Sequence, residues 1–207
     1  MRKYFLIILA FTITCTQAQK KTPVFLKAGF GISNVKLNSG KTSLDFGYSI
    51  GLEKYLKLYK TIMLNPDFSY EKTGYDNSGS KVKVNYINFA LPVMLDVTAM
   101  FDDEDDPSDE NFSLMAGVGP FAGYAVSGNY TIATGDKKSI SFGNGAADNR
   151  KPYNAGLILK SGFRVKKIFF GTQYNIGFTN LVPKDRITNG ASIKSRDFLI
   201  DVSIALK

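Results

Sequence analysis

The stretch from Ile168 to Leu181 reads IFFGTQYNIGFTNL and decides the fold class. Because successive side chains of a β-strand point to opposite faces, this stretch separates into two sets. The apolar set is Phe170, Thr172, Tyr174, Ile176 and Phe178, and the opposite set is Phe169, Gly171, Gln173, Asn175 and Gly177. Most of the chain repeats this alternation, and we find no convincing long helix in the sequence to cover the apolar faces. Lipid is the simplest environment that buries so many apolar strand faces, with polar and glycine positions lining a closed barrel.

The composition agrees with a single all-β domain. The chain has 207 residues, 19 of them glycine, 11 tyrosine and 16 phenylalanine. Its mean hydropathy is only -0.08, as expected when apolar and polar residues alternate along membrane-spanning strands. The formal net charge of +8 could suit nucleic acid, but it also suits a surface that meets phosphorylated lipid headgroups. We predict lipid contact and no nucleic-acid partner.

The N-terminus resembles a secretory signal peptide. A basic start at Arg2 and Lys3 precedes a short apolar run, and Thr16-Gln17-Ala18 offers a small-residue cleavage site. The apolar run is too short for a transmembrane helix. We predict a signal peptide at residues 1–18 and a mature barrel domain at residues 19–207. Cleavage before Cys15 to give a lipoprotein is the alternative, although Thr12-Ile13-Thr14 matches the usual lipoprotein signal poorly.

From Val24 onward the sequence reads as about eight strands of roughly ten residues, the length that a tilted strand needs to cross a bilayer. Long connections follow the first, third, fifth and seventh strands, whereas Lys54–Lys60 and Lys166–Lys167 are short. Membrane barrels show this asymmetry, with short periplasmic turns and longer outer loops. We therefore predict an antiparallel up-and-down transmembrane β-barrel. The predicted strands cover residues 24–33, 44–53, 62–71, 82–97, 114–126, 153–165, 168–181 and 198–206.

The predicted fourth strand changes phase. Val82, Val84 and Tyr86 share one parity, whereas Phe89 and the apolar positions after it share the other. One extra residue near Tyr86 would return all of these apolar side chains to one outward face. We therefore predict a β-bulge at this point of the strand.

No catalytic, cofactor or metal site is predicted. The chain has no histidine, so the histidine-dependent sites of known barrel hydrolases and acyltransferases cannot be built, and no other pair of nucleophile and base is evident. The glycines at 117, 119 and 123 alternate on a strand with no helix after them, which excludes a dinucleotide fingerprint. The acidic run at residues 102–106 lacks the ligand spacing of a calcium loop and is predicted to be a solvated loop.

The inward positions predict a polar network that fills the lumen. A barrel of about eight strands is only wide enough for side chains, and charges of both signs favour a paired, plugged interior. A small porin-like channel for ions or small solutes is the alternative function. A soluble carrier with inverted parity is a further alternative that parity alone leaves open. The predicted lumen residues are Lys27, Asp45, Glu53, Asp67, Glu71, Asp96, Lys160, Arg164, Gln173, Asn175 and Asp201.

Basic residues gather in the predicted outer loops and at the strand ends beside them. Lys137, Lys138, Arg150 and Lys151 lie in the longest loop, and we predict that they face the anionic groups of outer-leaflet glycolipid. A solvated loop surface without a specific ligand is the alternative.

Three motifs resemble one known family. Residues 89–95 (FALPVML), 117–124 (GVGPFAGY) and 173–180 (QYNIGFTN) are similar to strand motifs of the small outer-membrane β-barrel proteins of Bacteroidetes, the PorT-like or outer membrane protein beta-barrel domain family. The resemblance implies a cell outer membrane location and insertion by the barrel assembly machinery. It implies no agreed activity and identifies no protein partner. The C-terminal Leu206-Lys207 departs from the aromatic residue that usually ends such barrels.

Overall fold

The structure is a computed structural model that describes residues 22–38, 42–77, 79–100, 112–187 and 191–206. The predicted signal peptide at residues 1–18 and the acidic run at residues 102–106 lie outside these described residues. Within them, no helix is both long and apolar enough to cross a bilayer. Two short 3-10 helices are present, η1 (Thr98–Met100) and η3 (Lys184–Arg186). The strands are β1 (Val24–Leu37), β2 (Ser43–Lys54), β3 (Leu56–Lys57), β4 (Ile62–Leu64), β5 (Asp67–Asn77), β6 (Ser80–Ala90), β7 (Val93–Asp96), β8 (Phe112–Thr131), β9 (Lys137–Ser139), β10 (Tyr153–Val165), β11 (Ile168–Gly177) and β12 (Ile193–Ala205).

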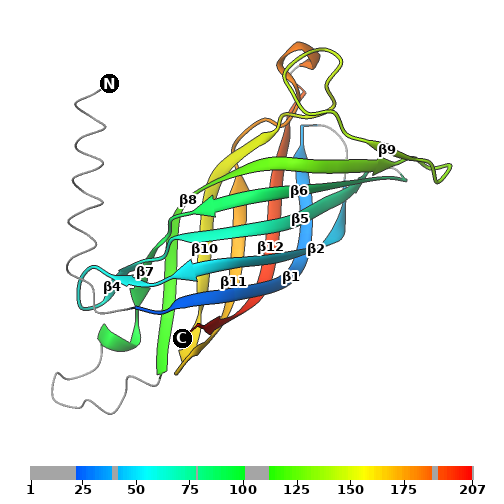
Figure 1. Cartoon of the computed structure of the whole chain (residues 1–207). Helices are drawn as coiled ribbons and strands as arrows, with labels where there is room; N and C mark the ends of the chain where they lie inside the picture. Colours follow the sequence, from blue (N-terminus) through cyan, green and yellow to red (C-terminus); the bar gives the residue numbers. More distant parts are fainter. Residues whose placement is uncertain (1–21, 39–41, 78, 101–111, 188–190, 207) are drawn as a thin grey trace, which may run out of the picture.

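Eight of these strands close into a ring, which confirms the predicted all-β, antiparallel barrel (Figure 1). The order is β10-β11-β12-β1-β2-β5-β6-β8, and pairing of β10 with β8 closes it. Successive strands of the ring are neighbours, so the topology is up-and-down. Closure leaves no unpaired sheet edge within the ring, as a barrel in hydrocarbon requires.

The remaining short strands lengthen three members of the ring. β3 follows β2 after Tyr55, β4 precedes β5 across Asn65 and Pro66, and β7 follows β6 across Leu91 and Pro92. Because proline has no N–H to donate, each proline interrupts the ladder rather than joining it. Backbone hydrogen bonds beside the prolines keep the strands paired at these interruptions. Asn65 N donates to Pro92 O at 2.9 Å, and Leu91 N donates to Pro120 O at 3.0 Å.

The two faces of the strands follow the predicted alternation. On β2, Phe46 is 78% exposed, whereas Glu53 on the opposite face is 1% exposed. Phe30 on β1 points outward in the same way, and Lys27 is buried in the lumen. The large apolar side chains of the ring therefore lie outside and many charged ones lie inside, which is the arrangement that suits a lipid surround.

The predicted bulge in the fourth strand is wrong. Val84 and Tyr86 are buried in the lumen, and β6 keeps one inward parity along its buried half. A register shift does occur beside Tyr86, but the extra residue is Val126 in the facing strand β8. Both lumen side chains pack against Ile140 from the long outer loop. An apolar side chain in this strand therefore marks packing under a loop and not the lipid face.

The ladders extend further at the outer end than the alternation predicts. β8 continues to Thr131 and forms a hairpin with β9, where Lys138 pairs with Tyr130 (Figure 1). β12 begins at Ile193 instead of residue 198. Most residues of these extensions are polar or glycine, so the strands continue by backbone hydrogen bonding where no apolar period shows them.

Arginine at Ile50 should destabilise the barrel by about 2–4 kcal/mol, because this outward side chain lies in the apolar band that meets lipid. Ile187 is a matched control, since it is also an exposed isoleucine but lies in an outer loop. The free energy of unfolding in lipid vesicles, from urea titrations, gives the comparison. Equal costs for Ile50→Arg and Ile187→Arg would contradict a lipid-facing β2.

Candidate functional site

An apolar cluster fills the lumen at the end where a two-residue turn joins β10 to β11. The Tyr55 ring meets Phe25 edge-on, with centroids 5.4 Å apart, and Phe169 at 5.6 Å. Glycine makes room for these rings: a Cβ at Gly162 would lie 2.7 Å from Phe169 Cζ. The cluster comprises Phe25, Tyr55, Met63, Met94, Met115 and Phe169.

Two buried lysines hold the next layer together. Lys160 Nζ donates to Glu53, to Asn65 Oδ1 at 3.0 Å and to Asp67 Oδ2 at 3.2 Å. Lys27 Nζ donates to the same Asp67 oxygen and to Gln173 Oε1 at 3.2 Å. Asp67 therefore joins both ammonium groups, and ladder positions on β1, β2, β5, β10 and β11 are tied across the barrel.

A carboxylate surrounded by neutral donors forms the layer above. Glu71 accepts from Ser69 Oγ at 3.2 Å, Asn88 Nδ2 at 2.6 Å and Gln173 Nε2 at 3.3 Å. Asn175 Nδ2 lies 3.5 Å from Glu71 Oε2 and completes this set. Gln173 bonds to both layers, so the ion pairs and the amide layer form one continuous network.

All eleven predicted lumen residues lie on the inner side, but they do not form one cluster. Lys27, Glu53, Asp67, Glu71, Lys160, Gln173 and Asn175 are joined in the network. Asp201 is buried beside it, and neither carboxylate oxygen has a hydrogen-bond partner in the described part of the chain. The other three lie towards the ends: Asp45 is 3.7 Å from Lys83, Asp96 accepts from Ala99 N at 3.2 Å, and Arg164 donates to Ser113 at 3.2 Å.

Sequence reasoning found the neutral partners Gln173 and Asn175 but missed three others, Asn65, Asn88 and Tyr55. Asn65 and Asn88 both have inward parity and are buried, and each bonds directly to a charged group. Tyr55 donates to Glu53 at 3.1 Å from a break between strands. Parity could have identified the two asparagines, because they alternate with the outward apolar residues of their strands. Tyr55 carries no such signal, since it lies outside the alternating segments.

Two small cavities lie among the described side chains of the lumen. The cavity beside Glu71, Asn88 and Phe121 measures about 10 Å³. A second cavity of about 10 Å³ lies under the outer mouth, between Tyr75 and Asp197. Each has room for about one water molecule. Side chains therefore occupy the interior along its length.

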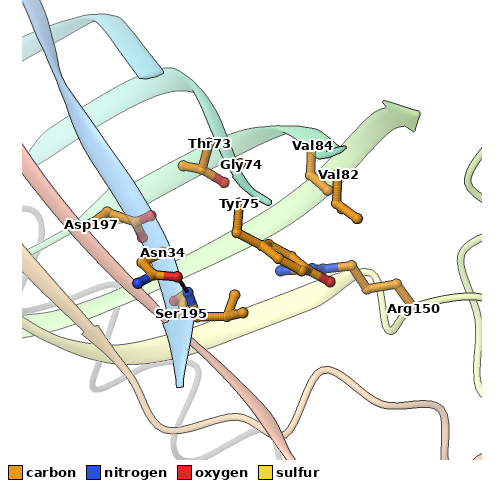
Figure 2. Close-up of a pocket in the computed structure, with 10 residues that line it drawn as sticks. Asn34, Thr73, Gly74, Tyr75, Val82, Val84, Arg150, Ser195 and Asp197 are labelled. Atoms are coloured by element: carbon orange, nitrogen blue, oxygen red, sulfur yellow. Dashed lines mark hydrogen bonds between the residues drawn. The ribbon is translucent and has the colours of Figure 1, made fainter. Parts of the chain in front are cut away.

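Arg150 closes the outer mouth. Its guanidinium lies beside the Tyr75 ring, 5.8 Å from the ring centroid (Figure 2). The Arg150 Nε donates to Tyr86 Oη at 3.2 Å. The backbone N–H of Arg150 donates to Ser141 O at 3.2 Å, and this bond joins the two ends of the loop segment between Ser141 and Arg150. Burial lowers the pKa of the Arg150 guanidinium, but Tyr86, Tyr75 and Asp197 raise it, and the net shift is upward. The group therefore stays charged inside the mouth.

This position corrects the prediction that Arg150 faces glycolipid. The residue is 6% exposed and points into the barrel, because its charge stacks on tyrosines below the loop. Lys137 and Lys138 are exposed on β9, and Lys151 is half-buried. Loop residues have no alternation, so no pattern distinguishes the inward arginine from its outward neighbours.

The two longest outer loops are fastened to each other. Lys151 N donates to Leu181 O at 2.9 Å, and Asp185 N donates to Asn144 O at 3.4 Å. Arg186 adds a side-chain bond to Asp148 O at 3.0 Å. The loops after β9 and β11 therefore form one surface, named here the outer platform (residues 140–151 and 181–187).

The described residues contain no group of three histidine, cysteine, aspartate or glutamate side chains placed to hold a metal ion. The buried carboxylates are instead distributed along the barrel, with lysine or amide donors between them. The arrangement suits a cross-strand brace.

Lys160→Met should destabilise the barrel by about 3–5 kcal/mol, because Glu53 and Asp67 lose the ammonium that compensates their buried charge. Adding Glu53→Gln should recover part of this loss, so a double-mutant cycle on the free energy of unfolding should show coupling between the two positions. Lys137→Met, on the exposed β9, is the control for the loss of one positive charge. Additive effects in the cycle would contradict the buried ion pair.

Arg150→Met should loosen the outer loop without unfolding the ring. Loss of the bond to Tyr86 should speed amide hydrogen exchange at residues 140–143 by about 10-fold, the range expected for a charged hydrogen bond. Hydrogen exchange followed by mass spectrometry provides the measurement, with exposed Lys184→Met as control. Unchanged exchange at residues 140–143 would show that Arg150 does not hold the loop.

Three solved structures are similar to the chain at low sequence identity. The crystal structure of Neisserial surface protein A has a TM-score of 0.51 and 11% identity, covering 88% of this chain and 97% of that one. The crystal structure of Ail from Yersinia pestis has a TM-score of 0.47 and 13% identity, covering 90% of this chain and 100% of that one. The outer membrane protein OprG from Pseudomonas aeruginosa has a TM-score of 0.43 and 13% identity, covering 90% and 97%.

The comparison with curated proteins gave no match. A family model described as "Outer membrane protein beta-barrel domain" matches residues 17–182, which is more than half of the chain. The match begins before β1 and reaches past β11, so it spans all of the ring except β12. The lipid-facing exterior and the closed ring described above are what such a domain requires. The chain therefore belongs to the outer membrane protein β-barrel domain family and is located in the outer membrane.

Proposed function

We propose that the protein is a non-enzymatic outer-membrane barrel that has a structural or binding role through its outer loops. The observation that carries this proposal is the filled lumen, in which Lys160 on β10 reaches Glu53 and Asp67 across the ring and Lys27 joins it at Asp67. A diffusion channel needs continuous water, whereas the cavities in this lumen measure about 10 Å³ each. The packed interior supports a brace for the barrel and not a path for solutes.

The outer platform supports the binding role. Its two loops are held together by backbone and side-chain bonds, including Arg186 to Asp148 O at 3.0 Å. A surface that is already ordered loses little conformational freedom when a partner binds. Lys184, Arg186 and Ile187 are exposed on it, so the platform offers positive charge beside an apolar side chain. A partner with an acidic and partly apolar surface fits these groups.

The non-enzymatic assignment rests on the chemistry of the chain. The sequence has no histidine, and the buried acids of the lumen are engaged with lysines and amides. The three strand motifs support a place among the PorT-like barrels of Bacteroidetes, with insertion by the barrel assembly machinery. Lys137 and Lys138 are exposed, which supports contact with outer-leaflet glycolipid.

The refolded protein should give no stepwise ion conductance in planar bilayers, because the lysine and carboxylate layers block the axis of the ring. A large porin inserted under the same conditions is the positive control. Reproducible conductance steps from the wild-type barrel would contradict the closed lumen and favour the porin-like channel.

A photo-crosslinking amino acid separates a binding role from a purely structural one. At Ile187 on the outer platform it should give adducts in native membranes, whereas at Lys167 in the periplasmic turn it should give none from the same partner. The absence of adducts at Ile187 in intact cells would leave the barrel with a structural role alone.

A further inference from the structure

Three basic residues lie on the outward face of the barrel, where β1 ends and β12 begins. Lys36 on β1 is the register partner of Lys194 on β12. Arg196 follows two residues later on β12 and therefore points to the same face. Directly opposed residues have Cβ atoms about 4.5–5.5 Å apart, so Lys36 and Lys194 start side by side, and Arg196 lies next to Lys194 along β12. This group is named here the rim cluster (Lys36, Lys194 and Arg196).

The chain supplies no carboxylate to the rim cluster. Residues 33–44 and 186–196, which include both connections at this edge, contain neither aspartate nor glutamate. The acids that follow each stretch are turned away, since Asp197 is buried in the lumen and Asp45 lies near Lys83. None of the ion pairs among the described residues includes a member of the cluster.

The geometry of the cluster favours an anion. Like charges directly opposite each other destabilise a sheet unless a counterion lies between them. Arg196 is fixed in place, because one of its terminal nitrogens, Nη1, donates to Gly177 O at 2.9 Å and to Ser195 O at 2.7 Å. These bonds use one nitrogen of the guanidinium fork and hold its plane at the strand end. A phosphate group is a matching acceptor for a guanidinium and two ammonium groups.

The level of the cluster indicates where that anion comes from. Further along the same faces, beyond Asn34 on β1, are Ile32 and Phe30 on β1 and Phe198 and Ile200 on β12, three of which are exposed. The outward surface therefore changes from apolar to cationic at the same height on two neighbouring strands. This end carries the long connections from β8 to β10 and from β11 to β12, which favour the outward side, so the change is expected at the headgroups of the outer leaflet.

We propose that Lys36, Lys194 and Arg196 bind a phosphate group of an outer-leaflet glycolipid whose acyl chains lie along Phe30 and Phe198. The acyl contact separates this ligand from free phosphate, which would meet the cations alone. The site is separate from the outer platform and from Lys137 and Lys138 on β9. It also requires no opening of the lumen, so it holds whether or not the barrel conducts.

The experiment measures binding of bis-phosphorylated lipid A to the refolded full barrel in detergent by native mass spectrometry. The rim variant carries Lys36→Gln, Lys194→Gln and Arg196→Gln. The matched control carries Lys57→Gln, Lys166→Gln and Lys167→Gln, which removes the same charge from exposed positions at the opposite end of the barrel. At low salt the rim variant should bind lipid A at least about 10-fold more weakly, and the control should stay within about 2-fold of the wild type.

Two further arms test the chemistry. Dephosphorylated lipid A should bind the wild type as weakly as lipid A binds the rim variant, and excess inorganic phosphate should not displace lipid A. Heat-modifiable migration in gels checks that each variant is folded. The proposal is overturned if the folded rim variant binds like the wild type, if the matched control loses as much affinity, or if free phosphate competes fully. A conducting wild-type barrel would contradict the proposed function and leave these outcomes unchanged.

Discussion

Backbone hydrogen bonding in hydrocarbon is the constraint on which the rest of the structure depends. An open sheet edge in lipid would leave N–H and C=O groups without partners, and the pairing of β8 with β10 removes that edge. Closure then fixes the role of each face, since lipid outside takes Phe30 and Phe46 while the small interior receives the alternate positions. The interior polarity of this barrel is thus a consequence of closing the ring.

Placing charged groups inside a small closed ring has a high desolvation cost. Lys27, Lys160 and the acids around them are removed from water, so each must have a partner or a donor nearby. The lumen meets this requirement in layers, with an apolar cluster below the ion pairs and Arg150 above them. The Lys160 ammonium lies 5.9 Å from the Phe169 ring centroid, which brings the apolar and ionic layers into contact. The barrel is consequently braced from within along much of its axis.

The sequence predicted the parts of this structure that repeat with period two. The number of ring strands, their antiparallel order and the inward parity of Glu53 or Gln173 all follow from alternation. The period failed where packing does not distinguish inside from outside, as at Val84, which is apolar and faces the lumen. The alternation made no prediction for Arg150, because the direction of a loop side chain depends on how the loop folds back over the mouth of the barrel. The pairing of the buried charges depends on distances across the ring, and a local sequence pattern carries no information on these distances.

The span of the ion pairs in the sequence bears on the order in which the barrel assembles. Lys160 and Glu53 are 107 residues apart, and Lys27 and Gln173 are separated by 146. Contacts between such distant residues form late in folding, because long chain segments must first be brought together. Hairpins such as β10–β11 have no such requirement, since a two-residue turn joins them. The internal charges therefore do not guide strand recognition during insertion. They stabilise the closed barrel once its first and last strands have paired.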